Sequence, residues 1–416
     1  MTDISIALIK IGVLLGGIMT AAAYFVLLER RVAAWVQDRR GPNRVGVPLS
    51  LLSPKLKDLR LFGLGQPAAD GLKMILKEEY TPAHVDRKLY ALAPIVIMSA
   101  ALSVYAVIPF GSEIPAIPQI GIEQPVALTI APLVDVGMIF VFALSSIAVY
   151  GVILGGWASN NKYSFLGGLR SSAQMVSYEL PLGLGLLGVV LASGSLRLDT
   201  IIGAQAESAW YAFMQPLGFI VFVVAAFAEA GRLPFDLPEC EQELIGGYHT
   251  EYSGMKLVLF LTAEFIHMIT ASFLIVILFL GGWHFPFLTG GIDTEITWPL
   301  AIIRVAVLMA KVFGVIFFFM LVRWSWPRFR FDQLMTLAWK IMLPLGVINL
   351  IAVACVTEIL HGQAGSSSIF IAIGIGWFVA VASWVVVAMM APMVTDNRPQ
   401  HCTDKFAIDS QMPPME

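Results

Sequence analysis

Long apolar runs separated by short polar connections dominate this sequence and limit what it can fold into. A run of about twenty apolar residues is long enough to cross a bilayer as one helix. Such runs lie near residues 4–28, 89–110, 132–157, 174–193, 211–229, 256–282, 300–323, 334–359 and 369–391. With 58% hydrophobic and only 13% charged residues, the 416-residue chain has too little polar surface for soluble domains. We predict an all-α polytopic membrane protein with about nine transmembrane helices. Residues 1–394 form its membrane domain, and residues 395–416 form a polar tail.

The positions of Lys and Arg predict the orientation of these spans. The loops after the first, third, fifth and seventh runs carry Arg30, Arg31, Arg39, Arg40, Arg44, Lys162, Arg170, Arg232, Arg328 and Arg330. The alternate loops 111–131, 283–299 and 360–368 carry none, and the loop near 194–210 carries only Arg197. Because short loops rich in Lys and Arg stay in the cytoplasm, the first group faces inward. An odd number of spans then puts the N-terminus outside and the tail inside.

An acidic segment, residues 230–255, lies between two apolar runs on the predicted cytoplasmic side. Its acidic residues are Asp236, Glu239, Glu241, Glu243 and Glu251, and Arg232 is its one fixed cation. One interpretation is a short helix beginning at Pro238, whose dipole the first acids would complement. That interpretation does not explain Glu239 and Glu243, because a like-charge pair four residues apart destabilises a helix. The carboxylates must therefore share protons, find partners elsewhere or stand in water.

The cysteine and histidine content excludes several kinds of redox site. The three cysteines are scattered and form no C-x-x-C motif, at Cys240, Cys355 and Cys402. Only His267 lies well inside a predicted span, so a bis-histidine haem site is not expected. The sequence also has no G-x-G-x-x-G loop and no P-loop lysine. We predict that this chain binds no redox cofactor, metal or nucleotide of its own, and no nucleic acid.

Charged residues at the end of the first span can be interpreted in two ways. Glu29, Arg30 and Trp35 there are typical of a basic membrane-edge anchor with an interfacial tryptophan. An acid next to an arginine at a membrane edge can also line the mouth of a polar cavity.

The longest predicted cytoplasmic connection, residues 47–80, contains an amphipathic pattern. From Pro67 onward one helical face is apolar and the other is polar, with Ala68, Leu72, Ile75 and Leu76 on the first and Asp70, Lys73 and Lys77 on the second. This pattern predicts a helix that lies in the membrane interface.

Charges inside the spans are rare enough that each suggests a function. They are Asp135, Glu179, Glu229, Glu264, Lys311 and Lys340. Glu264 and His267, three residues apart, share a helix face, as do Arg304 and Lys311, seven apart. A hydrated or lysine-paired carboxylate can exchange protons near neutral pH, which a proton relay requires. The alternative is that glutamate and lysine side chains pair only to hold helices together.

Five segments together resemble the heel subunit of respiratory complex I, the proton-pumping NADH:quinone oxidoreductase. They are Glu29 to Gly46, Gly65 to Glu79, Trp157 to Glu179, Arg232 to Gly254 and Pro327 to Met335. The similarity runs from about residue 5 to residue 390. In that family this component joins the membrane arm to the peripheral arm and forms much of the quinone cavity.

The resemblance implies roles for residues already singled out. Glu29, Arg30, Trp35, Asp70 and Arg232 would lie near the quinone chamber. The acidic loop would lie at the junction with the peripheral arm, and Glu179, Glu229 and Glu264 along a proton path.

The resemblance also implies partners and a location. The partners would be peripheral quinone-site subunits, small membrane subunits and antiporter-like subunits, with FMN and iron–sulfur clusters in partner chains. Quinone would be the substrate, and the location would be the lipid of a bacterial inner membrane.

Three departures from the family pattern stand out. The connection at 47–64 is longer than usual, the ninth span and tail occur in only part of the family, and some relatives carry an acid where Ser146 lies here. A relay at that point would need another group or water. The closest rival is the equivalent component of a membrane-bound hydrogenase or formate hydrogenlyase. A secondary transporter is disfavoured because the sequence shows no internal repeat.

Overall fold

The computed structural model describes residues 3–44, 61–116, 124–132, 134–236, 245–286, 288–290, 296–359 and 366–394. Within them the elements, in chain order, are α1 (Asp3–Val36), η3 (Leu61–Gly63), α2 (Gln66–Leu76), α3 (Arg87–Ser103), η4 (Val104–Ala106), β1 (Glu113–Ile114), β2 (Val126–Ala127), α4 (Gly137–Ala158), α5 (Lys162–Ser193), α6 (Leu198–Glu207), α7 (Tyr211–Met214), α8 (Pro216–Glu229), η6 (Gly247–His249), α10 (Gly254–Phe279), α11 (Trp298–Ser325), α12 (Phe331–Thr336), η7 (Leu337–Met342), α13 (Leu343–Ile359) and α14 (Ser366–Val394). The strands β1 and β2 form a two-stranded antiparallel ribbon.

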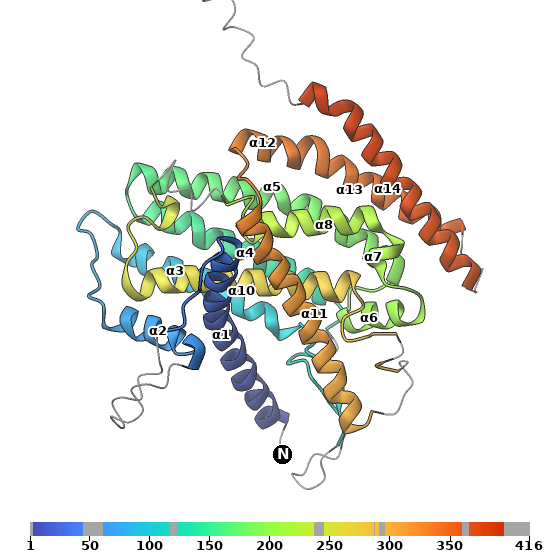
Figure 1. The fold of residues 1–416 in the computed structure, drawn as a ribbon, viewed down its shortest axis with the longest axis horizontal. Helices are drawn as coiled ribbons and strands as arrows, with labels where there is room; N and C mark the ends of the chain where they lie inside the picture. Colours follow the sequence, from blue (N-terminus) through green and yellow to red (C-terminus); the bar gives the residue numbers. More distant parts are fainter. Residues whose placement is uncertain are drawn as a thin grey trace, which may run out of the picture.

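The helices form one bundle with two steeply inclined members. In Figure 1, α5, α8, α10 and α13 run roughly parallel across the molecule, whereas α1 and α11 cross them steeply. Helix α5 packs against α4, α8 and α13, and α10 packs against α3, α8 and α11. Helix α14 lies at the outer edge and packs against α7, α8 and α13. The bundle therefore places α5, α8 and α10, each of which carries one of the predicted proton-path acids, side by side.

The prediction of an all-α polytopic membrane protein is confirmed. Eight of the described helices are long and apolar enough to cross a membrane, and they match eight of the nine predicted spans. The remaining prediction, residues 211–229, was too long, because Gln215 separates α7 from the 14-residue helix α8. Pro216 at the first turn of α8 explains the separate start, since a proline cannot continue the hydrogen bonding of a preceding helix.

The fourth span also differs from its predicted extent. Its helix begins at Lys162 instead of residue 174 and runs unbroken through Pro181 to Ser193. Asn161 caps its start by accepting a hydrogen bond from the Tyr163 amide, and Gly194, with φ of 67°, ends it. Glu179 therefore lies near the middle of this helix.

A wide helical turn interrupts the eighth span. The segment Leu337–Met342 is π-helical between α12 and α13. Pro344 lies directly behind it and has no amide hydrogen to donate to the Lys340 carbonyl. A wider turn accommodates that missing hydrogen bond.

A close backbone contact fixes the loop before α10. A Cβ at Gly167 of α5 would lie 2.7 Å from Gly247, so only glycine permits this approach. The contact holds η6, with Tyr248, against α5, and Tyr248 is buried.

The predicted amphipathic helix is present as α2, with Pro67 in its first turn. Its apolar residues Leu72, Ile75 and Leu76 are 46%, 63% and 76% exposed. Helix α2 packs against α1 and α10, so this apolar face points away from the bundle.

Candidate functional site

A buried carboxylate joins three parts of the chain at one end of the bundle. Glu29 of α1 accepts a hydrogen bond from Nη1 of Arg232 at 3.3 Å and forms an ion pair with Nη1 of Arg323 of α11 at 2.5 Å. The Arg232 side chain is only 5% exposed, and its guanidinium lies 4.2 Å from the centre of the Phe265 ring of α10. Because a buried charge is costly unless it is paired, Glu29 fixes the relative positions of α1, α11 and the segment after α8.

An open cleft of about 950 Å³ begins at Glu29. The residues that line it are Glu29, Arg30, Ala33, Arg39, Arg40, Gly41, Pro42, Asn43, Arg44 and Trp324. Four of the lining residues are arginines, so the cleft is strongly cationic and favours ligands that carry or develop negative charge.

Helix α2 is tied to the border of this cleft. The Arg30 guanidinium pairs with the Asp70 carboxylate at 2.8 Å, and Gln66 donates to the same carboxylate at 3.0 Å. Trp35 lies two turns beyond Glu29, is 60% exposed, and is not among the residues that line the cleft. The structure thus brings Glu29, Arg30, Asp70 and Arg232 together and leaves Trp35 on the surface.

The ends of the acidic segment are anchored in different places. Asp236 is buried and accepts a hydrogen bond from Arg328 at 3.3 Å. The Glu251 carboxylate accepts one from Asn161 at 2.6 Å, and its backbone carbonyl accepts one from the Tyr90 hydroxyl at 2.7 Å. The other three acids of the segment, and the helix predicted from Pro238, lie outside the described residues: Glu239, Glu241 and Glu243.

Two of the predicted proton-path acids hydrogen bond to hydroxyl groups of neighbouring elements. Glu179 of α5 accepts a hydrogen bond from Ser146 of α4, the position at which an acid was expected in some relatives. Glu264 of α10 accepts one from the Tyr248 hydroxyl at 2.9 Å. Each carboxylate is therefore held by a group that can both donate and accept a proton.

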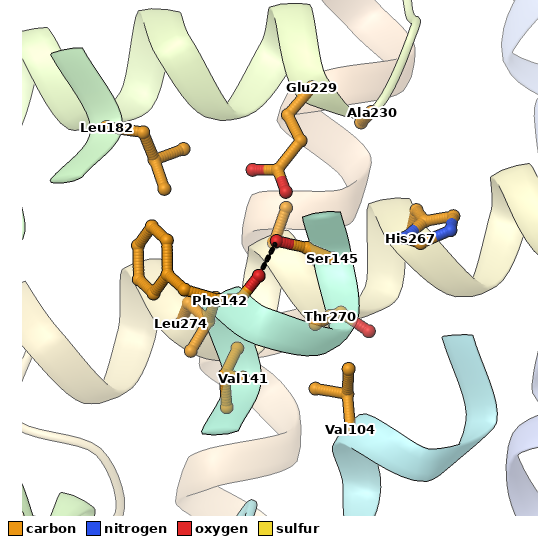
Figure 2. A pocket seen from close by; sticks show the side chains of 11 residues that line it. Val104, Val141, Phe142, Ser145, Leu182, Glu229, Ala230, His267, Thr270 and Leu274 are labelled. Atoms are coloured by element: carbon orange, nitrogen blue, oxygen red, sulfur yellow. Dashed lines mark hydrogen bonds between the residues drawn. The ribbon is translucent and has the colours of Figure 1, made fainter. Parts of the chain in front are cut away.

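The third acid, Glu229, points into a small cavity at the end of α8. Figure 2 shows its carboxylate above Ser145 of α4, with His267 of α10 to one side. The cavity measures about 20 Å³ and is lined mainly by apolar side chains. Ser145 donates to the Phe142 carbonyl at 3.0 Å, and Thr270 also lines the space.

The cations inside the spans do not all pair with carboxylates. The Lys311 ammonium donates to the carbonyls of Leu280, Gly282 and His284 at 2.6, 3.0 and 2.7 Å. It also lies 4.4 Å from the centre of the Trp210 ring. Three donors are all that an ammonium group has, so Lys311 satisfies the carbonyls at the end of α10. For this residue, helix pairing through glutamate was the wrong expectation.

Asp135 is likewise not an intramembrane charge. It precedes α4, its side chain is 86% exposed, and its carboxylate lies 3.8 Å from Arg197. The predicted start of that span at residue 132 was five residues too early, because the helix begins at Gly137.

Sequence reasoning missed three residues that complete these contacts: Arg323, Tyr248 and Ser145. Arg323 could have been found as a charge in the last turn of an apolar span. Tyr248 and Ser145 carry no such signal, because neutral hydroxyl residues are common in spans and loops.

Comparisons with known proteins place this site in a family. A family model described as NADH dehydrogenase matches residues 9–354. The chain belongs to this family. A relative from Geobacter metallireducens, named as an H-type component of NADH-quinone oxidoreductase, is 45% identical over 84% of this chain and 95% of its own length. A relative from Cytophaga hutchinsonii with the same name is 44% identical over 81% of this chain and 93% of its own. NADH-quinone oxidoreductase subunit 8 of Rhodothermus marinus is 43% identical over 82% and 94%. The resemblance drawn from the five motifs is therefore confirmed.

Proposed function

We propose that this chain forms the quinone-access chamber of an NADH-quinone oxidoreductase and couples quinone reduction to proton translocation. Membership of the family makes it a membrane subunit of such a complex, with the other subunits as its partners. The proposal concerns what the chain does there.

The observation that carries the proposal is the cationic cleft that begins at the buried Glu29 cluster. A quinone has two carbonyl oxygens that gain negative charge as electrons arrive, and fixed cations around them stabilise that charge. Arg30, Arg39 and Arg40 line the cleft, and Arg232 lies behind Glu29 at its inner end. Because Glu29 neutralises part of this charge, the inner end combines a carboxylate with two guanidinium groups.

Helix α2 supplies a route for an apolar quinone tail. Its exposed apolar face lies in the membrane interface in this proposal, and the Arg30–Asp70 ion pair fixes α2 beside the cleft. A long-tailed quinone can then keep its tail in lipid while its head passes between α1 and α2. The cleft side would face the cytoplasm of a bacterial inner membrane, where the arginine-rich loops lie.

Electrons would arrive from partner chains, since we propose that FMN and the iron–sulfur clusters belong to the peripheral subunits. The segment that contains Asp236 and Glu251 would contact the peripheral quinone-site subunits. Glu179, Glu229 and Glu264 lie on helices that pack together and would carry protons toward the small and antiporter-like membrane subunits. The relatives' names favour this function over that of a membrane-bound hydrogenase component.

Photolabelling of the assembled complex tests the chamber. A long-tailed quinone with a photoreactive group on its ring should label peptides from Gly41–Arg44 and Trp324, and excess unlabelled quinone should prevent that labelling. A ring-deleted lipid with the same photoreactive group serves as the control. Labelling confined to other helices, or labelling by the control lipid alone at these residues, would remove the cleft from the quinone path.

A further inference from the structure

The cavity below Glu229 has room for one water molecule. It measures about 20 Å³, and a single water needs roughly 10–15 Å³ together with two or more polar partners. The polar groups on its walls are the Glu229 carboxylate, the Ser145 and Thr270 hydroxyls and the His267 imidazole. A cavity of this size with such walls is suited to hold an ordered water.

The His267 ring has an unmet hydrogen bond in this space. Its Nε2 atom is inaccessible to solvent and has no hydrogen-bond partner within the part of the chain that the structure describes. An unpaired buried nitrogen is unfavourable unless a water satisfies it. His267 lines the same cavity as Glu229, so one water can reach both.

The other polar groups of the cavity are already engaged. The Thr270 hydroxyl lies 3.0 Å from both the Tyr105 hydroxyl and the Ile266 carbonyl. Ser145 donates its proton to the Phe142 carbonyl. His267 is therefore the wall residue, besides Glu229, with capacity for an additional proton.

The position of His267 on α10 extends the connection to Glu264. The two residues are three apart, so they lie on one face of the helix, one turn from each other. Glu264 lies on the η6 side, where it accepts from Tyr248, and His267 lies on the cavity side. The imidazole thus stands between two carboxylates that belong to different helices.

We propose that His267, together with one water in this cavity, carries protons between Glu229 and Glu264. The inference rests on the proposed proton path and supplies the group that path needs where Ser146 replaces an acid. A protonated Glu229 gives its proton to the water, which passes one of its own protons to Nε2. The products are a Glu229 carboxylate and a His267 imidazolium, so net charge is conserved. The imidazolium then returns to neutral imidazole by protonating Glu264.

Variants of His267 and of the cavity test this step in the assembled enzyme. His267→Phe removes both ring nitrogens, and His267→Gln keeps a hydrogen-bonding group that cannot carry a proton. Both should lower quinone-linked turnover by about tenfold or more, the scale on which a positioned proton carrier acts. The KM for quinone should not change, and the NADH:ferricyanide rate, which bypasses quinone, should stay at the wild-type level and report assembly.

A second variant fills the cavity without touching a titratable group. Ala271 lines the cavity, so Ala271→Val should displace the water and slow turnover. Ala263→Val makes the same change two turns earlier on α10, at a buried position that does not line the cavity, and should leave the rate near wild type. The solvent deuterium isotope effect on turnover should rise in Ala271→Val and stay unchanged in Ala263→Val.

The outcomes separate this inference from the function on which it rests. If Glu229→Gln lowers turnover while the His267 and Ala271 variants keep full rates, the histidine and its water are not on the path, and the proposed function stands. If Glu229→Gln also keeps its full rate and proton stoichiometry, the path itself fails. Full activity in His267→Gln with loss in His267→Phe would show that His267 only fills space and makes a hydrogen bond, which overturns the proposal.

Discussion

Replacing Glu29 by Gln should destabilise the complex through one residue above all, Arg232. The substitution keeps the shape of the side chain but leaves two guanidinium groups facing a neutral amide. Arg232 is 5% exposed and cannot regain water, and removing the partner of a buried charge costs about 3–5 kcal/mol. Its contact with the Phe265 ring persists and retains roughly 1 kcal/mol. Arg323 is 19% exposed and adds at most about 1 kcal/mol, because water and other groups can reach it. We expect a loss of about 3 kcal/mol in total.

The comparison with Arg323→Gln makes the prediction specific. That variant leaves Glu29 paired with Arg232, so it should cost no more than about 1 kcal/mol. The assay is thermal inactivation of NADH:ferricyanide-competent purified complex in one detergent at fixed salt, with Glu29→Asp as the charge-retaining control. Equal shifts for Glu29→Gln and Arg323→Gln, or no shift for Glu29→Gln, would refute the view that burial of Arg232 sets the magnitude.

Three other predictions address separate parts of the chain. Leu72→Asp or Ile75→Asp should raise the apparent KM for long-tailed quinones more than for short ones, because a charge on the apolar face weakens the lodging of α2 in the interface; equal effects on both quinones would remove α2 from the access route. Lys311→Met should lower the melting temperature of the complex and leave proton stoichiometry unchanged, because the lysine binds helix-end carbonyls; a lost proton per turnover would instead make it part of the relay. Burial raises the pKa of Asp199, which nearby Arg197 lowers and Glu113 raises further. The folded state therefore holds that proton to a higher pH than the unfolded state does, and stability falls as pH rises through this window. Asp199→Asn should consequently raise the melting temperature at pH 7.5, and its benefit should shrink at pH 5; a benefit that grows on acidification would contradict the sign.

The fold was largely predictable because bilayer thickness sets the length of each apolar run. The eight long spans follow from hydropathy alone. The fifth failed because hydropathy does not register that Gln215 and Pro216 divide an apolar run into α7 and α8. The extra length of α5 escaped for a related reason, since residues 162–173 are polar enough to resemble a loop yet pack as a helix against glycines of α4.

The site was predictable where charge is unusual and not where it is neutral. Glu29, Arg232 and Glu229 stand out because a charge in an apolar setting needs a reason. The pairing of Glu29 with Arg323 could not be derived, because α1 and α11 are distant in the sequence and nothing local specifies that they cross. The hydroxyl groups that hold Glu179 and Glu264 were invisible for the same reason, and so was the cavity beside His267.

The measurement that tests the central claim most directly is the number of protons moved per NADH oxidised in sealed membrane vesicles that contain Glu179→Gln or Glu229→Gln. Each substitution is nearly isosteric, so the NADH:ferricyanide rate should show that assembly is intact. If these carboxylates carry protons coupled to quinone chemistry, quinone-linked turnover and proton movement will fall together while the KM for quinone stays the same. Full turnover with full proton stoichiometry in both variants would contradict the account and leave the two acids with a structural role.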